Sequence, residues 1–447
     1  MKKEIINLLK SILGYLSRMI ISKFRPDIIA VTGSVGKTSA KEAIYAVLAH
    51  SYSLHKTNKD HWLVRRSRGN LNNELGMPLA IIANWKDDLL DLISRGQPSG
   101  TKRFRKAVFW FNAVVAAVFK IIFGQKEHYP NALILEYGAD RPSDMKKMLK
   151  IAVPNIGVVT AIGQIPVHVE FYQNPEEVAK EKFKLIDSLP GGGRAVLNFD
   201  DEMVMRFKEK TKVQVITFGF GEGADVKISN FENRSVYVST PLGSNYRPEG
   251  IFFKIEHQKN IIPVTVKNVF GRAQAYSVAA AFAVGIIYSI NLVEIAELIE
   301  RYYLPAKHRM NLIQGIKDSW IIDDSYNASP LSMKEAVETF KDLKAVRKIA
   351  VLGDMLELGK YSVESHESIG KMVADAADYL ITVGLRGKFI AEKAKESGMS
   401  SKYVFSFDTV EESLVAIQNL VKSGDLILVK ASRAIGLDKV VEEIKKI

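Results

Sequence analysis

Apolar residues recur along the chain at two spacings, which predict alternating strands and helices. Residues 27–32, 132–136 and 156–160 are short apolar runs of strand length, and each ends in polar residues. Residues 37–50 follow the first run and carry apolar side chains at helical spacing. Such alternation is typical of an α/β fold, in which helices cover a parallel sheet and sites form at the carboxyl ends of the strands.

The alternation is more regular in the last third of the chain. A domain boundary is expected near residues 302–308, so that residues 27–304 form a central domain and residues 305–447 form a second, Rossmann-like α/β domain. The remaining predicted strands are residues 195–198, 320–323, 348–352, 379–383 and 426–429.

Two segments combine apolar residues with an excess of basic ones. Residues 1–26 place apolar side chains at helical spacing among Lys and Arg, which predicts a basic amphipathic helix. Residues 102–126 form a second such stretch, inside an apolar insertion at residues 84–128. Charged residues interrupt the first apolar run and Asn112 interrupts the second, so neither is expected to span a membrane. Each either lies on a membrane surface or packs on the protein itself.

Composition narrows the class of protein. The 447 residues are 47% hydrophobic and 25% charged, which is ordinary for a globular protein and excludes a disordered or collagen-like chain. The absence of cysteine excludes a disulfide scaffold, a cysteine nucleophile and thiolate metal sites. The 62 Lys and Arg residues against 50 Asp and Glu give a net charge of +12. This charge favours a polyanionic partner: nucleic acid, an anionic membrane surface or phosphorylated small molecules.

The sequence VTGSVGKTS, residues 31–39, stands between a predicted strand and a predicted helix, the setting of a phosphate-binding loop (P-loop). Its glycines let backbone N–H groups approach a phosphate, Lys37 supplies a positive charge, and the Thr38 hydroxyl can bind Mg²⁺. A glycine-rich stretch at residues 219–223 is expected to be only a turn, because no amphipathic helix follows it. The residues expected to bind the nucleotide are Thr32, Gly33, Ser34, Val35, Gly36, Lys37, Thr38 and Ser39.

Candidate metal ligands lie near this loop in the predicted sheet. Glu136 ends a strand, and hard cations prefer oxygen ligands such as its carboxylate. His168 is by spacing alone more often structural than a ligand. Lys180, Lys182 and Lys184 recur on a predicted helix, for which the simplest interpretation is a solvated face.

Four further segments resemble the Mur ligase family, in that family's order. They are GNLNNELGMPLA (residues 69–80), LILEYGADRPSDM (133–145), DDSYNASPLSM (323–333) and AVLGDMLELG (350–359). The resemblance covers residues 27–447 and implies a P-loop ATPase domain followed by a ligase domain. It also implies a cytoplasmic enzyme of cell-wall precursor synthesis that uses ATP and Mg²⁺. The chain is expected to be a monomer. The segments are most similar to the branch that joins D-alanyl-D-alanine to UDP-N-acetylmuramoyl-tripeptide through an acyl phosphate.

The resemblance also implies roles for single residues. Lys37 would hold the β- and γ-phosphates, His168 would bind a second Mg²⁺, and Lys182 matches a lysine that the family carbamylates. The implied metal ligands are Thr38, Glu136, His168 and Lys182, the implied nucleotide contacts from the second domain are Arg309 and Asp324, and the implied substrate contacts are Asn72, Asn73, Lys430 and Arg433.

The chain departs from the family's pattern at several points. Only about 26 residues precede the first strand, where this branch usually carries a UDP-binding domain, so that domain is expected to be missing. Ala273, Gln274 and Ser277 stand where the family has His and Asn, which changes the expected adenine contacts, and His308 replaces a glycine.

Three alternatives follow from these departures and from the charge. The first is a ligase of the same superfamily with a different, lipid-linked acceptor, peripheral on the inner face of the membrane. The second is an ATPase acting on nucleic acid, which is disfavoured because no aromatic residues interleave with the basic runs. The third is a membrane-associated nucleotide-binding protein without turnover.

Overall fold

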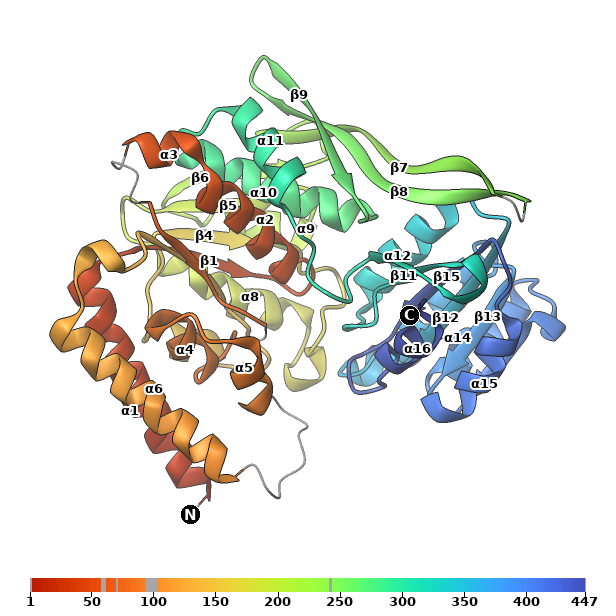
Figure 1. Ribbon diagram of the computed structural model, residues 1–447, viewed down its shortest axis with the longest axis horizontal. Helices are drawn as coiled ribbons and strands as arrows, with labels where there is room; N and C mark the ends of the chain where they lie inside the picture. Colours follow the sequence, from red (N-terminus) through yellow and green to blue (C-terminus); the bar gives the residue numbers. More distant parts are fainter. Residues whose placement is uncertain (1, 58–61, 70, 94–102, 241–242, 447) are drawn as a thin grey trace.

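The computed structural model describes residues 2–57, 62–69, 71–93, 103–240 and 243–446. Within these residues the chain builds two α/β bodies, each around its own sheet (Figure 1). The chain passes from the first body to the second between residues 302 and 311. The prediction of an α/β fold with mostly parallel sheets is confirmed.

The first body is built on nine strands. These are β1 (Asp27–Thr32), β2 (Val64–Arg66), β3 (Ala132–Glu136), β4 (Ile156–Val159), β5 (Arg194–Asn198), β6 (Gln214–Gly219), β7 (Val226–Thr240), β8 (Gly243–His257) and β9 (Asn260–Lys267). They form one sheet in the order β2-β3-β1-β4-β5-β6-β7-β8-β9. Neighbours from β2 to β7 pair in parallel, and β7, β8 and β9 extend the sheet as an antiparallel ribbon.

Helices cover both faces of this sheet. They are α1 (Lys2–Phe24), α2 (Lys37–His50), α3 (Tyr52–Thr57), α4 (Gly76–Ile82), α5 (Asp87–Ile93), α6 (Arg103–Phe123), α7 (Asp144–Leu149), α8 (Pro175–Asp187), α9 (Glu202–Lys208), α10 (Arg272–Ile287) and α11 (Leu292–Tyr302), with 3₁₀ turns η1 (Lys126–His128) and η2 (Val169–Phe171). Alternate residues of a strand point to opposite faces. Ile29 and Val31 of β1 therefore pack with α2, α10 and α11, whereas Ile28 and Ala30 pack in the core that holds α1, α4, α6 and α8.

The second body follows the same principle with six strands. The strands are β10 (Asn311–Gln314), β11 (Trp320–Asp323), β12 (Arg347–Gly353), β13 (Tyr379–Val383), β14 (Val404–Phe407) and β15 (Asp425–Lys430), in the order β10-β11-β15-β12-β13-β14. The helical elements are η3 (Ile316–Asp318), α12 (Pro330–Asp342), η4 (Gly359–Tyr361), α13 (Ser362–Val373), α14 (Gly387–Glu396), η5 (Ser401–Tyr403), α15 (Val410–Leu420) and α16 (Asp438–Ile444). Only β10 pairs antiparallel, at one edge, so the body is doubly wound.

Every strand that the sequence predicts lies within one residue of its predicted ends. Residues 219–223 form a turn between β6 and β7, as expected. The ribbon of β7, β8 and β9 was missed, because an antiparallel ribbon with one face in solvent mixes polar residues among apolar ones.

The two basic apolar segments form α1 and α6, which lie side by side at the edge of the first body far from the second (Figure 1). Leu13 of α1 and Phe109 of α6 are buried in the same core as the sheet. The helices run in the same direction, because Lys23 Nζ near the end of α1 donates to the carbonyl oxygen of Ile121 near the end of α6, at 2.7 Å. Contrary to expectation, both helices are long and apolar enough to cross a membrane by length and composition alone.

Candidate active site

The phosphate loop joins the carboxyl end of β1 to the N-terminus of α2. Gly33 and Gly36 have φ angles of 146° and 86°, and a Cβ atom on Gly33 would lie 2.1 Å from Thr160 Oγ1. The backbone therefore requires glycine at Gly33. The first turn of α2 has no side-chain cap, so its N–H groups and the positive end of the helix are available to a phosphate. Lys37 Nζ donates to the carbonyl oxygen of Gly33 at 2.8 Å, and burial lowers the pKa of this ammonium group.

Glu136, at the end of β3, is 4% exposed and lies beside this loop. Its carboxylate accepts hydrogen bonds from Thr38 Oγ1 at 3.0 Å and from Asn72 Nδ2 at 3.2 Å, and Lys41 Nζ lies 3.9 Å away. Burial alone would raise the pKa of Glu136, but Lys41, Lys37 and the other charges nearby outweigh burial and hold it below its ordinary value. The carboxylate is therefore ionised and adjoins a hydroxyl, a pair of oxygen ligands that suits a hard cation.

Lys182 is 1% exposed, so the interpretation of its helix as a solvated face is wrong for this residue. The two lysines on either side of it along α8 fit that interpretation, because Lys180 and Lys184 pair with Glu177 and Glu181 on the same helix. Burial, helped by the positive charge of Lys37, lowers the pKa of Lys182 to about 7. A large share of this amine is therefore neutral near neutral pH.

His168 has a left-handed backbone with a φ of 71°, and its ring lies between two carboxylates. Its Nε2 atom is 3.2 Å from Asp140 Oδ1, and its Nδ1 atom contacts Glu357 of the second body. The charge of Asp140 partly offsets the lowering of the pKa values of Lys37 and Lys182, which places all three groups in one neighbourhood.

The site residues fit Mg²⁺ only with help from the nucleotide. Among the described residues, no three His, Asp or Glu side chains are grouped closely enough to hold a metal ion alone. Mg²⁺ usually binds one or two carboxylates and completes its shell with water and substrate phosphates. Glu136 and Thr38 beside an open helix N-terminus match that pattern.

The second body contributes Arg309. Its guanidinium donates to Thr38 Oγ1 at 3.3 Å and lies over the ring of Tyr326, 4.2 Å from the centroid. Arg433 approaches the same ring at 5.5 Å. Asp324 binds Lys430 Nζ at 2.5 Å, so these two predicted contacts lie together in an ion pair.

The remaining predicted residues have separate surroundings. Asn73 does not join Asn72 at Glu136; its Oδ1 atom accepts from the N–H groups of Leu75 and Gly76 at the start of α4. Asn73 therefore has a capping role at the start of α4 in this structure. Separately, the Thr32 hydroxyl donates to the carbonyl oxygen of Tyr137 at 2.9 Å.

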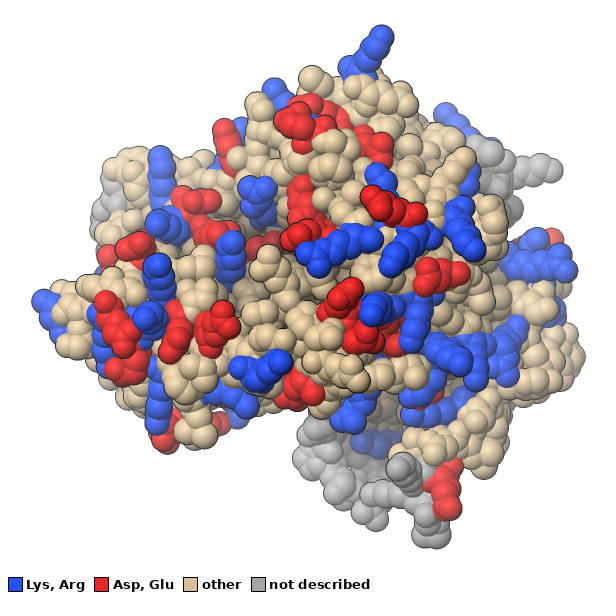
Figure 2. Space-filling view, turned by 180° about the vertical axis from the view of Figure 1, so that it is seen from behind, with Lys and Arg blue, Asp and Glu red and all other residues tan. Residues whose placement is uncertain are grey.

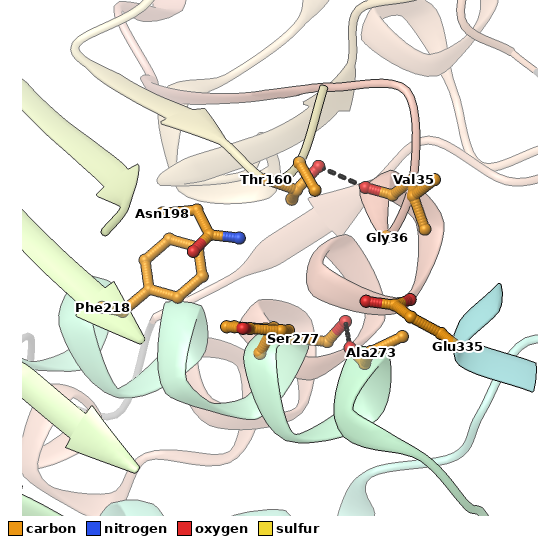
Figure 3. Close-up of a pocket in the computed structure, with 10 residues that line it drawn as sticks. Val35, Gly36, Thr160, Asn198, Phe218, Ala273, Ser277 and Glu335 are labelled. Carbon is orange, nitrogen blue, oxygen red and sulfur yellow. Dashed lines mark hydrogen bonds between the residues drawn. The ribbon is translucent and has the colours of Figure 1, made fainter. Parts of the chain in front are cut away.

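Beside the phosphate loop a pocket lies between the two bodies (Figure 3). Ala273 and Ser277, two of the positions that depart from the family's pattern, line it together with Asn198 and Phe218. Glu335 reaches in from α12, and burial raises the pKa of its carboxyl group to about 7.

The third departing residue, Gln274, faces the linker between the bodies instead of the pocket's lining. Its Nε2 atom donates to the carbonyl oxygen of Arg309 at 3.1 Å, and its Oε1 atom accepts from the Tyr303 hydroxyl at 2.6 Å. His308, where the family has glycine, holds a φ of 61° and lies 2.7 Å from Asp323 through Nδ1. These contacts position Arg309.

Sequence reasoning missed Lys41, Asp140 and Glu335. Lys41 lies one helical turn after Lys37, and Asp140 lies four residues after Glu136. These short spacings from predicted site residues could have indicated that Lys41 and Asp140 belong to the site. Glu335 could not have been found in this way, because only the tertiary structure brings it from the second body to the pocket.

Comparison with known proteins agrees with this geometry. The Mur ligase middle domain matches residues 31–88 and 117–285, and the glutamate ligase domain of Mur ligases matches residues 308–433. The UDP-N-acetylmuramoyl-tripeptide--D-alanyl-D-alanine ligase of Bacillus subtilis is 26% identical over 97% of this chain and 79% of its own length.

Solved structures show the same fold. MurF from Acinetobacter baumannii has a TM-score of 0.72 and 23% identity, covering 96% of this chain and 79% of its own. MurF from Thermotoga maritima in complex with ADP has a TM-score of 0.71 and 23% identity, covering 97% of this chain and 83% of its own. The family models together cover both bodies, so this chain belongs to the Mur ligase family and is an ATP-dependent ligase.

Proposed function

We propose that this enzyme joins D-alanyl-D-alanine to UDP-N-acetylmuramoyl-tripeptide in peptidoglycan precursor synthesis. The observation that carries the proposal is the convergence of Lys37, Glu136 and Lys182 from the first body with Arg309 from the second. The name of the Bacillus subtilis relative, matched over most of both chains, supports this choice of substrates.

The chemistry asks mainly for positioning and charge neutralisation. The tripeptide carboxylate attacks the γ-phosphorus of ATP, an O–P bond forms, and ADP leaves. The amine of D-alanyl-D-alanine then attacks the acyl carbon, loses a proton and displaces phosphate. Lys37 and the N-terminal turn of α2 hold the phosphates in both steps, and Arg309 approaches them from the second body. Lys430 and Arg433, together with Asn72, would contact the substrates, and Asp324 the nucleotide.

Thr38 and Glu136 would hold one Mg²⁺, and His168 and a carbamate on Lys182 would hold a second. Bound Mg²⁺ neutralises charge on the transferred phosphoryl group. The neutral fraction of Lys182 supports carbamylation, because only an uncharged amine adds to CO2.

We assign the enzyme to the cytoplasm as a monomer, peripheral on the inner face of the membrane. A second candidate is a ligase of the same family with a lipid-linked acceptor. The observation that favours it is the exposed apolar surface of α1 and α6.

The test measures phosphate release from ATP and product mass, with each substrate omitted in turn. We expect turnover only when ATP, UDP-N-acetylmuramoyl-tripeptide and D-alanyl-D-alanine are all present, and no turnover by Lys37→Ala. Phosphate release that needs neither peptide substrate contradicts the proposal. Turnover with a lipid-linked tripeptide but not with the UDP-linked one selects the second candidate.

A further inference from the structure

α1 and α6 carry apolar side chains on their solvent faces as well as on the faces that pack on the body. On α1, Ile5, Leu8 and Ile12 are 61%, 62% and 38% exposed. On α6, Phe104, Phe111 and Phe119 are 79%, 68% and 62% exposed. Their spacings of three, four, seven and eight residues keep each set on one face of its helix. These six side chains are called the outer stripes below.

Large exposed apolar patches on a soluble protein mark a surface that something covers. Most of the chain in these helices also lies outside the family's common domain. The Mur ligase middle domain begins matching at residue 31 and skips residues 89–116. The outer stripes therefore lie mainly outside the residues that the middle-domain model matches.

The same two helices concentrate the positive charge of the protein. Their 44 residues contain nine Lys and Arg against one acidic residue, Glu4, a net charge of +8 out of +12 for the chain. Arg18 and Lys23 are exposed and bond to backbone carbonyls of Lys150 and Ile121, which leaves their charges uncancelled. From behind, blue Lys and Arg side chains outnumber red ones toward the lower right, over the first body (Figure 2).

The positive charge of α1 and α6 favours a lipid bilayer over a second copy of the chain as the partner that covers the outer stripes. A second copy of the chain would bring two strongly positive surfaces together, and like charges across an interface oppose association. A bilayer with anionic headgroups supplies both the apolar layer and the opposite charge.

The packing of the helices selects an orientation on that bilayer. Another face of each helix is committed to the body, where Leu13, Ile20 and Phe24 of α1 are at most 3% exposed. Lys10 Nζ also binds Glu74 at 2.7 Å. A spanning arrangement would break these contacts and expose the core, whereas helices lying in the plane of the interface keep them.

We propose that α1 and α6 dock the enzyme on an anionic lipid bilayer, with the outer stripes in the headgroup–acyl boundary and the body standing in the cytoplasm. The inference rests on the proposed function only in placing the body of the enzyme on the cytoplasmic side of the bilayer. α1 and α6 lie at the edge of the first body away from the second body, so docking leaves the substrate side open (Figure 1).

The test is flotation of the full chain with vesicles of phosphatidylcholine alone or with 30% phosphatidylglycerol. We expect the wild type to float with the anionic vesicles, and to do so less at high salt. The triple variant Phe104→Gln, Phe111→Gln and Phe119→Gln should lose binding by at least tenfold, since burial of one large apolar side chain already contributes more than about that factor. A matched control changes Leu304, Leu385 and Val415 to Gln; these are 76%, 69% and 65% exposed on the linker and second body.

The control should bind like the wild type, and both variants should keep the wild-type melting temperature and soluble ligase activity. Unchanged flotation of the Phe variant, failure of the wild type to float, or equal binding to both vesicle types overturns the proposal. A wild-type dimer in sedimentation that the Phe variant dissociates, without flotation, assigns the stripes to a second copy. Each of these results leaves the substrate-omission assay unaffected, so the two proposals fail separately.

Discussion

Lys182 should make the activity depend on dissolved CO2 with a midpoint near neutral pH. Carbamylation joins the neutral amine to CO2 through a new N–C bond and releases one proton. With a pKa of about 7, the neutral fraction rises from about a tenth at pH 6 to about nine-tenths at pH 8. A lysine of ordinary pKa, about 10.4, would be less than about 1% neutral at pH 8. The shift thus raises the reactive fraction by roughly two orders of magnitude at that pH.

The assay follows ligase turnover from pH 6 to 9 in CO2-depleted buffer and at a fixed concentration of dissolved CO2. We expect CO2 to increase the rate, with the increase growing through pH 7. Lys182→Met should abolish the CO2 response, and the exposed Lys180→Met on the same helix is the matched control. Equal rates with and without CO2, or full activity of Lys182→Met, would refute the reasoning.

Three further predictions concern the loop, the second body and the Asn pair. Gly33→Ala should abolish ATP binding in calorimetry while the fold persists in circular dichroism, because the added Cβ overlaps Thr160 Oγ1; binding of normal strength would contradict the loop geometry. Arg309→Ala removes a charged hydrogen bond worth about 1.5–3 kcal/mol, so kcat/KM for ATP should fall roughly 10- to 150-fold, and an unchanged value would remove Arg309 from the site. Asn73→Ala should lower the free energy of unfolding by about 1 kcal/mol, as loss of a helix cap does, and leave KM unchanged. Asn72→Ala, by contrast, should lower the activity. Equal kinetic effects of the two variants would show that both residues contact substrate.

The elements that a local pattern encodes were the ones that could be predicted. β1, the loop after it and α2 combine an apolar run, two glycines and a periodic helix within residues 27–50, so each signal supports the next. The ribbon of β7, β8 and β9 lacks such a signal although its consecutive strands pair as hairpins, because the strands are only partly buried and mix polar with apolar residues.

Burial of charged residues was the part of the site that spacing could not predict. Lys180, Lys182 and Lys184 are alike in sequence, yet only Lys182 is buried, because the turn of α8 aims it at the sheet. Lys41 is fully buried for the same kind of reason: its position on α2 directs it toward Glu136. The roles of Lys182, His168 and the second-body residues stay predictions that the experiments above address.

Two contacts that cross between the two bodies make the candidate active site depend on how the bodies are arranged. Arg309 reaches from the second body to the Thr38 hydroxyl, and Glu357 reaches to His168. If the bodies separated, Arg309 would move away from Thr38 and His168 would lose its contact with Glu357 at the same time. An arrangement with the bodies apart would therefore have an incomplete reaction centre, and we expect it to hydrolyse bound ATP slowly.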